Sequence, residues 1–284
     1  MNSVAVIGSV GQSVFLPVKN FHTGGETVTA SDIHTEPGGK GFNQAVAAAR
    51  CGADVAFLAA VGGDGYKKTI ADFLKQEGIH GVLAEKPGAT AYAAILTDSA
   101  GSNRVTVYLG ASLDPADAVG FVETIAPFDI LLLSNEVPEA VNIAAATAAR
   151  TRGAKIVLNP APQQTLSEEM MSLVDWFTPN EHETAGLEGR RNVIETLGSR
   201  GCRIRATGET VPAFLVKAVD TTGAGDTFNG ALAAALAAGR PLRDAVWYAN
   251  AAAAVSVTGR YAVSSIPNAE TIEKFLSKQG GKTQ

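Results

Sequence analysis

Short apolar runs alternate with helical patterns along most of the chain. Buried strands are predicted at 4–7, 55–60, 130–133, 156–158 and 176–178. Apolar residues between and after these runs recur with the helical period, which predicts helices at about 43–50, 66–77, 138–150, 167–174, 226–239 and 242–257. This alternation is typical of βαβ units. The expected fold class is therefore α/β, with a mostly parallel sheet that helices cover on both faces.

Two stretches, at about 13–37 and 91–109, depart from this alternation. Each has a period-two apolar pattern and a turn signal, Gly24-Gly25 in the first and Asp-Ser-Ala-Gly at 98–101 in the second. The second stretch predicts a β-hairpin. Together they predict a small β-sheet inserted in a single domain that takes in residues 1–284. This sheet would be a lid over a site, an oligomer interface or surface decoration.

Composition narrows the class of protein. The chain has 284 residues, of which 46% are hydrophobic, and its net charge of −5 has no basic cluster of the kind that binds nucleic acid. Cys51 and Cys202 are too few for a disulfide framework, which favours a reducing compartment. No stretch approaches about 18 uninterrupted apolar residues. We expect a cytoplasmic protein without a nucleic-acid or membrane partner.

The segment at 213–232 has the strongest pattern for chemistry. An apolar, strand-like run at 213–219 leads to a turn with Gly223 and Gly225, and Asp226 opens an alanine-rich helix. Glycines let the backbone approach a ligand closely, and a helix N-terminus suits a phosphate. The Asp226 carboxylate could accept a proton from a hydroxyl that attacks the phosphorus. The motif taken alone favours the plainer interpretation that Asp226 caps the helix, because Asp is common at that position.

Two further segments offer groups for a polyol. The sequence PGGKGFNQ at 37–44 lacks the Walker A spacing, but its glycines permit close approach and Asn43 can donate and accept hydrogen bonds. It could also be an ordinary loop that enters a helix. Glu136 follows the predicted strand at 130–133, where open α/β sheets bind ligands. It could accept sugar hydroxyls or cap the next helix.

Two more segments offer groups for a metal ion or a phosphate. The sequence TPNEHE at 178–183 places carboxylates after a predicted strand, where one could hold hydrated Mg²⁺, although Asn180 could simply be a cap. His182 is expected at the surface, and nothing indicates zinc. The sequence TLGSRG at 196–201 could contact phosphate through Thr196 and backbone amides, or be a tight turn.

The motifs PGGKG-x-NQA, TPNE, TLGSRG and DTTGAGDTFNG occur in an order that resembles the ribokinase-like (PfkB-type) family of carbohydrate kinases across essentially the whole chain. The resemblance implies a three-layer α/β/α domain with a β-sheet lid. It also implies ATP-dependent phosphorylation of a hydroxyl of a sugar or related polyol. Asp226 matches the family's general base, and Gly223, Ala224 and Gly225 match its anion hole.

The resemblance also implies the remaining site residues. The matched acceptor contacts are Gly39, Lys40, Asn43 and Glu136. The matched nucleotide contacts are Asn180, Thr196, Gly198, Ser199, Gly201 and Asn250. Glu183 would organise Mg²⁺ through water. A monovalent cation, expected to be K⁺, would lie among Asp220, Thr222, Ser256, Gly259, Tyr261 and Ser265, mostly on backbone carbonyls. The lid would form a homodimer interface.

The sequence departs from the family at three places. Gly11 and Ser13 stand where ribokinases carry an Asn-x-Asp pair that grips the sugar, and charge-assisted bonds of this kind contribute roughly 1.5–3 kcal/mol each. Ribose as the acceptor is therefore in doubt. The crossover at 184–195 is too short for the family's usual helix, and Asn250 replaces a frequent His. Two alternatives stay open, a nucleoside kinase of this fold and a catalytically weak sugar-binding homologue.

Overall fold

The computed structural model describes residues 2–99 and 102–280. Its centre is a six-stranded sheet in the order β10-β9-β8-β1-β4-β5, and every neighbouring pair is parallel. The strands are β1 (Ser3–Ile7), β4 (Asp54–Val61), β5 (His80–Glu85), β8 (Ile130–Ser134), β9 (Lys155–Asn159) and β10 (Trp176–Phe177). All but β5 coincide with predicted runs.

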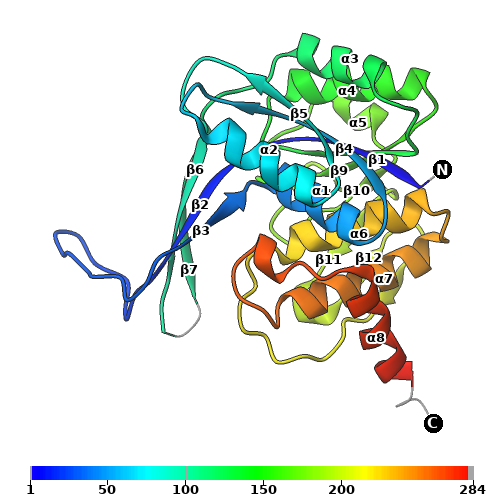
Figure 1. The fold of residues 1–284 in the computed structure, drawn as a ribbon. Helices are drawn as coiled ribbons and strands as arrows, with labels where there is room; N and C mark the ends of the chain where they lie inside the picture. Colours follow the sequence, from blue (N-terminus) through cyan, green and yellow to red (C-terminus); the bar gives the residue numbers. More distant parts are fainter. Residues whose placement is uncertain (1, 100–101, 281–284) are drawn as a thin grey trace.

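Helices cover both faces of this sheet (Figure 1). One face packs on α3 (Pro115–Thr124), α4 (Glu139–Thr151) and α5 (Glu168–Leu173). The other packs on α1 (Lys40–Arg50), α2 (Tyr66–Gln76) and α6 (Ala224–Ala237). Successive strand residues enter opposite cores: Val4 and Val6 pack with α1 and α6, whereas Ala5 and Ile7 pack with α3 and α4. This arrangement confirms the predicted three-layer α/β class.

Outside α6 lies a further layer made of α7 (Leu242–Ser256) and α8 (Ala269–Gly280). The apolar run at 213–219 belongs to this layer, and the prediction of a strand there is wrong. Phe214 packs its ring against Trp247 of α7 and Phe275 of α8, while Leu215 is fully exposed. Within the described residues this run pairs with no strand, so its alternation reflects packing against helices.

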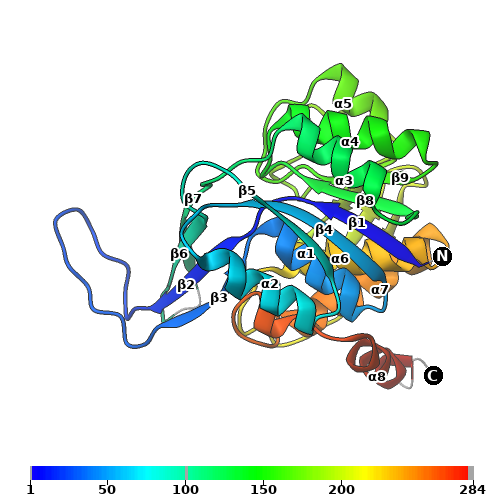
Figure 2. The same ribbon diagram turned by 45° about the horizontal axis from the view of Figure 1, so that its top comes forward.

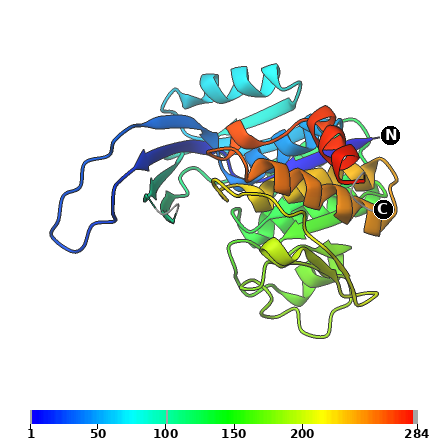
Figure 3. The same ribbon diagram turned by 90° about the horizontal axis from the view of Figure 1, so that it is seen from below.

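A four-stranded sheet, the lid, projects from one side of the domain (Figure 2). Its order is β3-β2-β6-β7, with β2 and β6 parallel and the other pairs antiparallel. The strands are β2 (Gly11–Pro17), β3 (His34–Gly38), β6 (Ala91–Thr97) and β7 (Asn103–Tyr108). The predicted hairpin is confirmed as β6 and β7, although Ala100 and Gly101 of its predicted turn lie outside the described residues. The connection between β2 and β3 extends away from the body (Figure 3).

The shortened crossover lacks a helix, as predicted. Residues 184–193, all of which the structure describes, form turns and bends. They lead to a second small sheet of β11 (Ile194–Thr196), β12 (Cys202–Ile204) and β13 (Glu209–Val211). A parallel bridge between Phe177 and Val193 continues the central sheet toward it. Within the described residues, no helix is long and apolar enough to span a membrane.

Helices α1 and α6 approach each other closely at Gly230. A Cβ on Gly230 would lie 2.3 Å from the carbonyl oxygen of Gln44 and 2.5 Å from Cβ of Ala47. Only a glycine fits this crossing, because any side chain would force the two helices apart. The close approach brings the start of α1 beside the start of α6, and thereby determines where the polar side chains of both helices meet.

We predict that Gly230→Ala destabilises the protein. The added methyl group overlaps the α1 backbone, and overpacking of this kind costs about 1–3 kcal/mol of unfolding free energy. Urea denaturation followed by circular dichroism measures the change.

Gly120→Ala in α3 is the matched control. A Cβ there meets nothing within 4 Å, so this variant should be neutral or more stable by up to about 1 kcal/mol. Equal stability of the two variants would contradict the packing argument.

Candidate active site

Asp226 lies in the first turn of α6 and is only 7% exposed. Its Oδ2 accepts a hydrogen bond from Nδ2 of Asn43 at 2.9 Å, and its Oδ1 accepts one from Nε2 of Gln44 at 3.2 Å. The helix begins after Gly223, whose φ is 75°, and no side chain caps it. Asp226 is therefore not a cap. Two adjacent side chains of α1 hold it instead.

Burial dominates the electrostatics of the Asp226 carboxylate. Burial raises the pKa of Asp226, while the Lys40 charge and the Asn43 amide act in the opposite direction. The nearby Asp226 carboxylate in turn raises the pKa of Lys40, with smaller contributions from Glu136 and Glu183. Desolvation outweighs the favourable partners because the group is almost wholly enclosed.

A cleft joins the predicted catalytic residues to part of the predicted nucleotide site. Asp226 faces it together with Gly223, Ala224 and Gly225. The remaining lining residues are Lys40, Asn159, Ala161, Thr178, Asn180, Glu183, Thr196, Thr221 and Asn229. Helix geometry leaves the amides of Gly225 and Asp226 without an intrahelical acceptor, so this wall of the cleft suits an anion.

Glu183 and Asn180 form a compact turn at the edge of the cleft. The Asn180 amide donates to Oε2 of Glu183 at 3.0 Å, and Oδ1 of Asn180 accepts from the His182 amide at 2.8 Å. His182 is exposed, as predicted. The described residues contain no cluster of three or more His, Cys, Asp or Glu side chains that would enclose a metal. One half-exposed carboxylate nevertheless fits Mg²⁺, which keeps several waters and shares phosphate oxygens.

Glu136 caps a helix, but not the one that the sequence suggested. Its Oε2 accepts the amide of Lys40, the first residue of α1, at 2.9 Å and also accepts a hydrogen bond from the Ser9 hydroxyl. Helix α4 begins after Pro138 without a side-chain cap. Helix α1 starts three residues before the predicted position, because this distant carboxylate supplies its cap. Gly39 precedes it with a φ of 104°.

The two positions that depart from the family lie on the inner half of β2. A Cβ on Gly11 would lie 2.2 Å from the Ala91 carbonyl oxygen, so the lid pairing leaves no room for a side chain there. Ser13 is buried and its hydroxyl lies over Gly38, where an added Cβ would be 2.1 Å away. Ser13 therefore offers only a short hydroxyl side chain at the position where the resemblance led us to expect a carboxylate in relatives.

The predicted nucleotide residues do not all meet at the cleft. Thr196 lines it, while the loop that contains Gly198, Ser199 and Gly201 continues from it as a short 3-10 turn. Asn250 is buried, and both ends of its amide are in use. It accepts from the Cys202 thiol at 3.0 Å and donates to the carbonyls of Val211 and Pro212. A nucleotide contact by Asn250 stays a prediction.

The predicted cation residues surround one turn. Both oxygens of Asp220 are engaged, Oδ1 by the amide and hydroxyl of Thr222 and Oδ2 by the Tyr261 amide. The Ser265 hydroxyl donates to the Tyr261 carbonyl at 3.0 Å. The Gly259 amide donates to the Ser256 carbonyl at 3.0 Å. The Asp220 carboxylate and the Tyr261 and Ser256 carbonyls therefore all accept hydrogen bonds from the protein, and a monovalent cation at these residues stays a prediction.

Sequence reasoning missed several buried polar residues of the site. Gln44 bridges Asp226 and Asn159, and the Thr178 hydroxyl donates to Oδ1 of Asn229 at 2.5 Å. Asn229 also donates to the Gly225 carbonyl, which steadies the first turn of α6. The position of Asn159 at the carboxyl end of a predicted strand was the available signal.

Comparisons with known proteins identify the family of the chain. A family model described as pfkB family carbohydrate kinase matches residues 1–269. The chain is 37% identical to a ribokinase from Haemophilus influenzae, over 96% of this chain and 98% of that protein. The crystal structure of a Thermotoga maritima ribokinase is 34% identical with a TM-score of 0.84, covering 97% of this chain and 99% of that one. An Arabidopsis thaliana ribokinase complexed with ribose and ATP is 27% identical with a TM-score of 0.82, covering 96% and 98%.

We predict that Asp226→Asn stabilises the protein at neutral pH. Because burial raises the pKa of this carboxyl in the folded state, the folded protein loses stability as pH rises from the unfolded pKa through the folded one. The variant lacks this loss, so its unfolding free energy relative to that of the wild type should increase as pH rises through this range. Urea titrations at several values between pH 4.5 and 8 measure it.

The exposed Asp72, which pairs with Lys68, supplies the control. Asp72→Asn should change stability by less than about 0.5 kcal/mol. If the stability of Asp226→Asn relative to the wild type increased toward low pH, the explanation would be wrong.

Proposed function

Because the chain belongs to the pfkB family of carbohydrate kinases, as its motifs predicted, we propose that it transfers the terminal phosphoryl group of ATP to a hydroxyl of a sugar or related polyol. The supporting observation is the Asp226 carboxylate at the start of α6, in one cleft with Lys40 and Glu183. The Arabidopsis relative complexed with ribose and ATP supports both the acceptor class and the nucleotide.

In this proposal Asp226 is the general base. A catalytic base works best with a pKa near the operating pH, and burial moves the pKa of Asp226 in that direction. Asn43 and Gln44 orient the carboxylate through its two oxygens. The Oδ1 atom of the same Asn43 amide is buried without a protein partner, so it could accept a hydrogen bond from the hydroxyl that is phosphorylated.

The Gly223–Ala224–Gly225 turn is the proposed anion hole. Phosphoryl transfer depends mainly on positioning and on stabilising charge, and unpaired amides at a helix start supply both. Lys40 adds a positive charge that faces Asp226. Mg²⁺ bound with ATP would neutralise phosphate charge there. Glu183 would hold it through water, beside Asn180 at the phosphates.

On the acceptor side, Gly39, Lys40 and Asn43 would surround the polyol. Glu136 would accept a hydrogen bond from one of its hydroxyls through Oε1, the oxygen that does not cap α1. The short side chain of Ser13 favours an acceptor other than ribose. Nucleosides are the second acceptor class that we propose. A cavity beside Glu136 has Val10, Leu109 and Leu113 in its wall, which suits a nucleobase.

For the rest of the site, we propose that Thr196, Gly198, Ser199 and Gly201 flank the nucleotide, with Asn250 holding the sheet behind them. K⁺ would bind where the 220–222 turn meets the loop after α7, among Asp220, Thr222, Ser256, Gly259, Tyr261 and Ser265. The lid would carry the homodimer interface, because Val105, Val107 and Tyr108 of the edge strand β7 are each about half exposed.

We predict ATP-dependent turnover with at least one acceptor from a panel of pentoses, deoxypentoses, hexoses, sugar acids and nucleosides. A coupled assay for ADP release measures it, and mass spectrometry identifies the phosphorylated product. Asp226→Asn should lower kcat by at least about two orders of magnitude, because it removes the base, while ATP binding persists.

Calorimetric titration of Asp226→Asn with ATP and Mg²⁺ is the control for nucleotide binding. Near-normal kcat in this variant would refute the role of Asp226. No ADP above background with any acceptor would instead favour a sugar-binding homologue.

We also predict a dimer that depends on the lid. Val107→Glu places a charge on an exposed apolar position of β7 and should convert a dimer to a monomer in sedimentation velocity experiments. Val219→Glu is the matched control, since Val219 is 48% exposed and lies outside the lid. A monomeric wild-type protein, or two variants with the same mass, would exclude the lid interface.

A further inference from the structure

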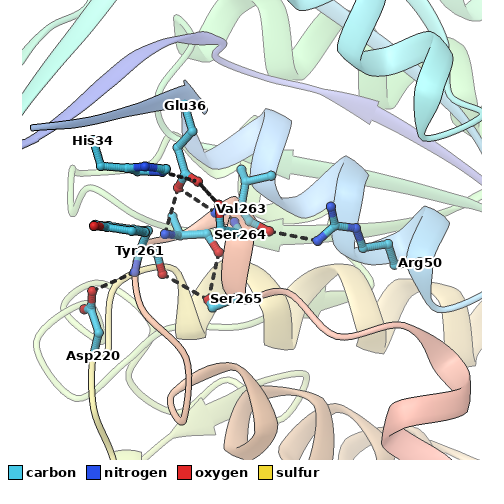
Figure 4. A network of polar contacts seen from close by, with 9 residues as sticks. His34, Glu36, Arg50, Asp220, Tyr261, Val263, Ser264 and Ser265 are labelled. Atoms are coloured by element: carbon cyan, nitrogen blue, oxygen red, sulfur yellow. Dashed lines mark hydrogen bonds and ion pairs between the residues drawn. The ribbon is translucent and has the colours of Figure 1, made fainter.

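One buried carboxylate of the lid binds the loop that follows α7 (Figure 4). Glu36 of β3 is 6% exposed. Its Oε1 accepts the amides of Ala262 and Val263, both at 2.9 Å. Its Oε2 accepts the amide and the hydroxyl of Ser264. Four donors from three consecutive residues thus converge on one side chain, which none of the motifs described above includes.

The same loop contains a strained residue that the lid supports. Tyr261 has a φ of 69°, the only positive φ among non-glycine residues that the structure describes. Its ring stacks on His34 of β3 at 3.8 Å between centroids, with Phe15 of β2 edge-on at 5.0 Å. A bulky residue in this conformation persists only where its surroundings hold it. Here the surroundings are two lid strands.

The held loop lies directly against the start of α6. A Cβ built on Gly223 would be 3.1 Å from the methyl group of Ala262, so Ala262 borders the residue that begins the helix. The Tyr261 amide also donates to Asp220 at 2.9 Å, and Asp220 in turn accepts from Thr222. A displacement of this loop would therefore reach the 220–223 turn through both packing and hydrogen bonds.

The opposite edge of the lid contacts the same turn. Asn103 of β7 donates from Nδ2 to the Thr222 hydroxyl at 2.8 Å, and its Oδ1 accepts from Thr97 of β6. The two outer strands of the lid sheet thus reach the residues before Gly223 from two sides. Arg50 of α1 fixes the far end of the loop through the carbonyls of Val263 and Ile266.

We infer that Glu36 is a positioning residue for phosphoryl transfer. Glu36 holds the 261–264 loop against Gly223. The geometry of the 223–225 turn therefore depends on the position of the lid. This inference rests on the proposed function for its catalytic consequence. The amides of this turn would be correctly placed for the reacting phosphoryl group only while β3 of the lid contacts the 261–264 loop.

Glu36→Gln tests the inference. Its amide nitrogen would face backbone donors, so the loop should shift, and misplacement of this order lowers kcat by about ten- to a hundredfold. The KM for ATP should stay within about threefold, because no group that binds the nucleotide is removed. Glu26→Gln is the control, since Glu26 is an exposed carboxylate of the β2–β3 connection that accepts the Thr23 amide.

A double-mutant cycle separates coupling from local damage. Ala262→Gly keeps the amide that donates to Glu36 but removes the methyl group that faces Gly223. It should lower kcat by itself, and the double variant should be no slower than Glu36→Gln, because both changes break one link. Multiplicative losses would overturn the inference. If Glu36→Gln does not fold, Ala262→Gly with unchanged kcat overturns it as well.

Amide hydrogen exchange of the free proteins gives a readout independent of catalysis. Glu36→Gln should speed exchange in peptides that cover 220–226, and Glu26→Gln should not. Unchanged exchange there would overturn the inference, even if kcat fell. If the wild-type protein phosphorylates no acceptor, the proposed function fails, whereas the exchange experiment still decides whether the lid and the turn are coupled.

Discussion

The burial of one carboxylate between two helix starts is the constraint on which this structure depends. An enclosed carboxylate is costly unless donors reach it, and the two amide donors to Asp226 come from consecutive residues of α1. They reach it only because Gly230 lets α1 and α6 nearly touch. The central sheet, in turn, places both helix starts at the carboxyl ends of its strands. The close packing of α1 and α6 at Gly230 therefore influences the protonation of the Asp226 carboxyl.

Much of the architecture could be predicted because its signals are local. Five of the six strands of the central sheet are short apolar runs, and most helices follow the 3.6-residue period, so these elements were found within a few residues. Strand β5 and helices α3 and α8 were not predicted. The run at 213–219 has the same local pattern and forms no strand, because its partners are aromatic residues of α7 and α8. The start of α1 was also misplaced, since its cap is Glu136, 96 positions away.

The site residues also fall into those with a local sequence signal and those without one. Residues within contiguous motifs, such as Asp226 and the glycines before it, were assigned from sequence, and the structure brings Asp226 into one cleft with Lys40, Asn180, Glu183 and Thr196. Gln44 and Asn159 were missed because their role exists only where α1, β9 and α6 converge. Glu36 was missed for a similar reason: its partners are backbone amides more than two hundred positions later. A backbone amide has no sequence signature.

The order of pairing in the lid has a consequence for how the chain folds. Its central strands β2 and β6 pair in parallel, with Gly11 opposite Ala91, and β1 continues into β2 across only three residues. Between β2 and β6 the chain completes β3, α1, β4, α2 and β5. Closing so long a loop is entropically unfavourable until the intervening elements are in place. The lid is thus a late-assembling part of the molecule, built on a core that must already exist.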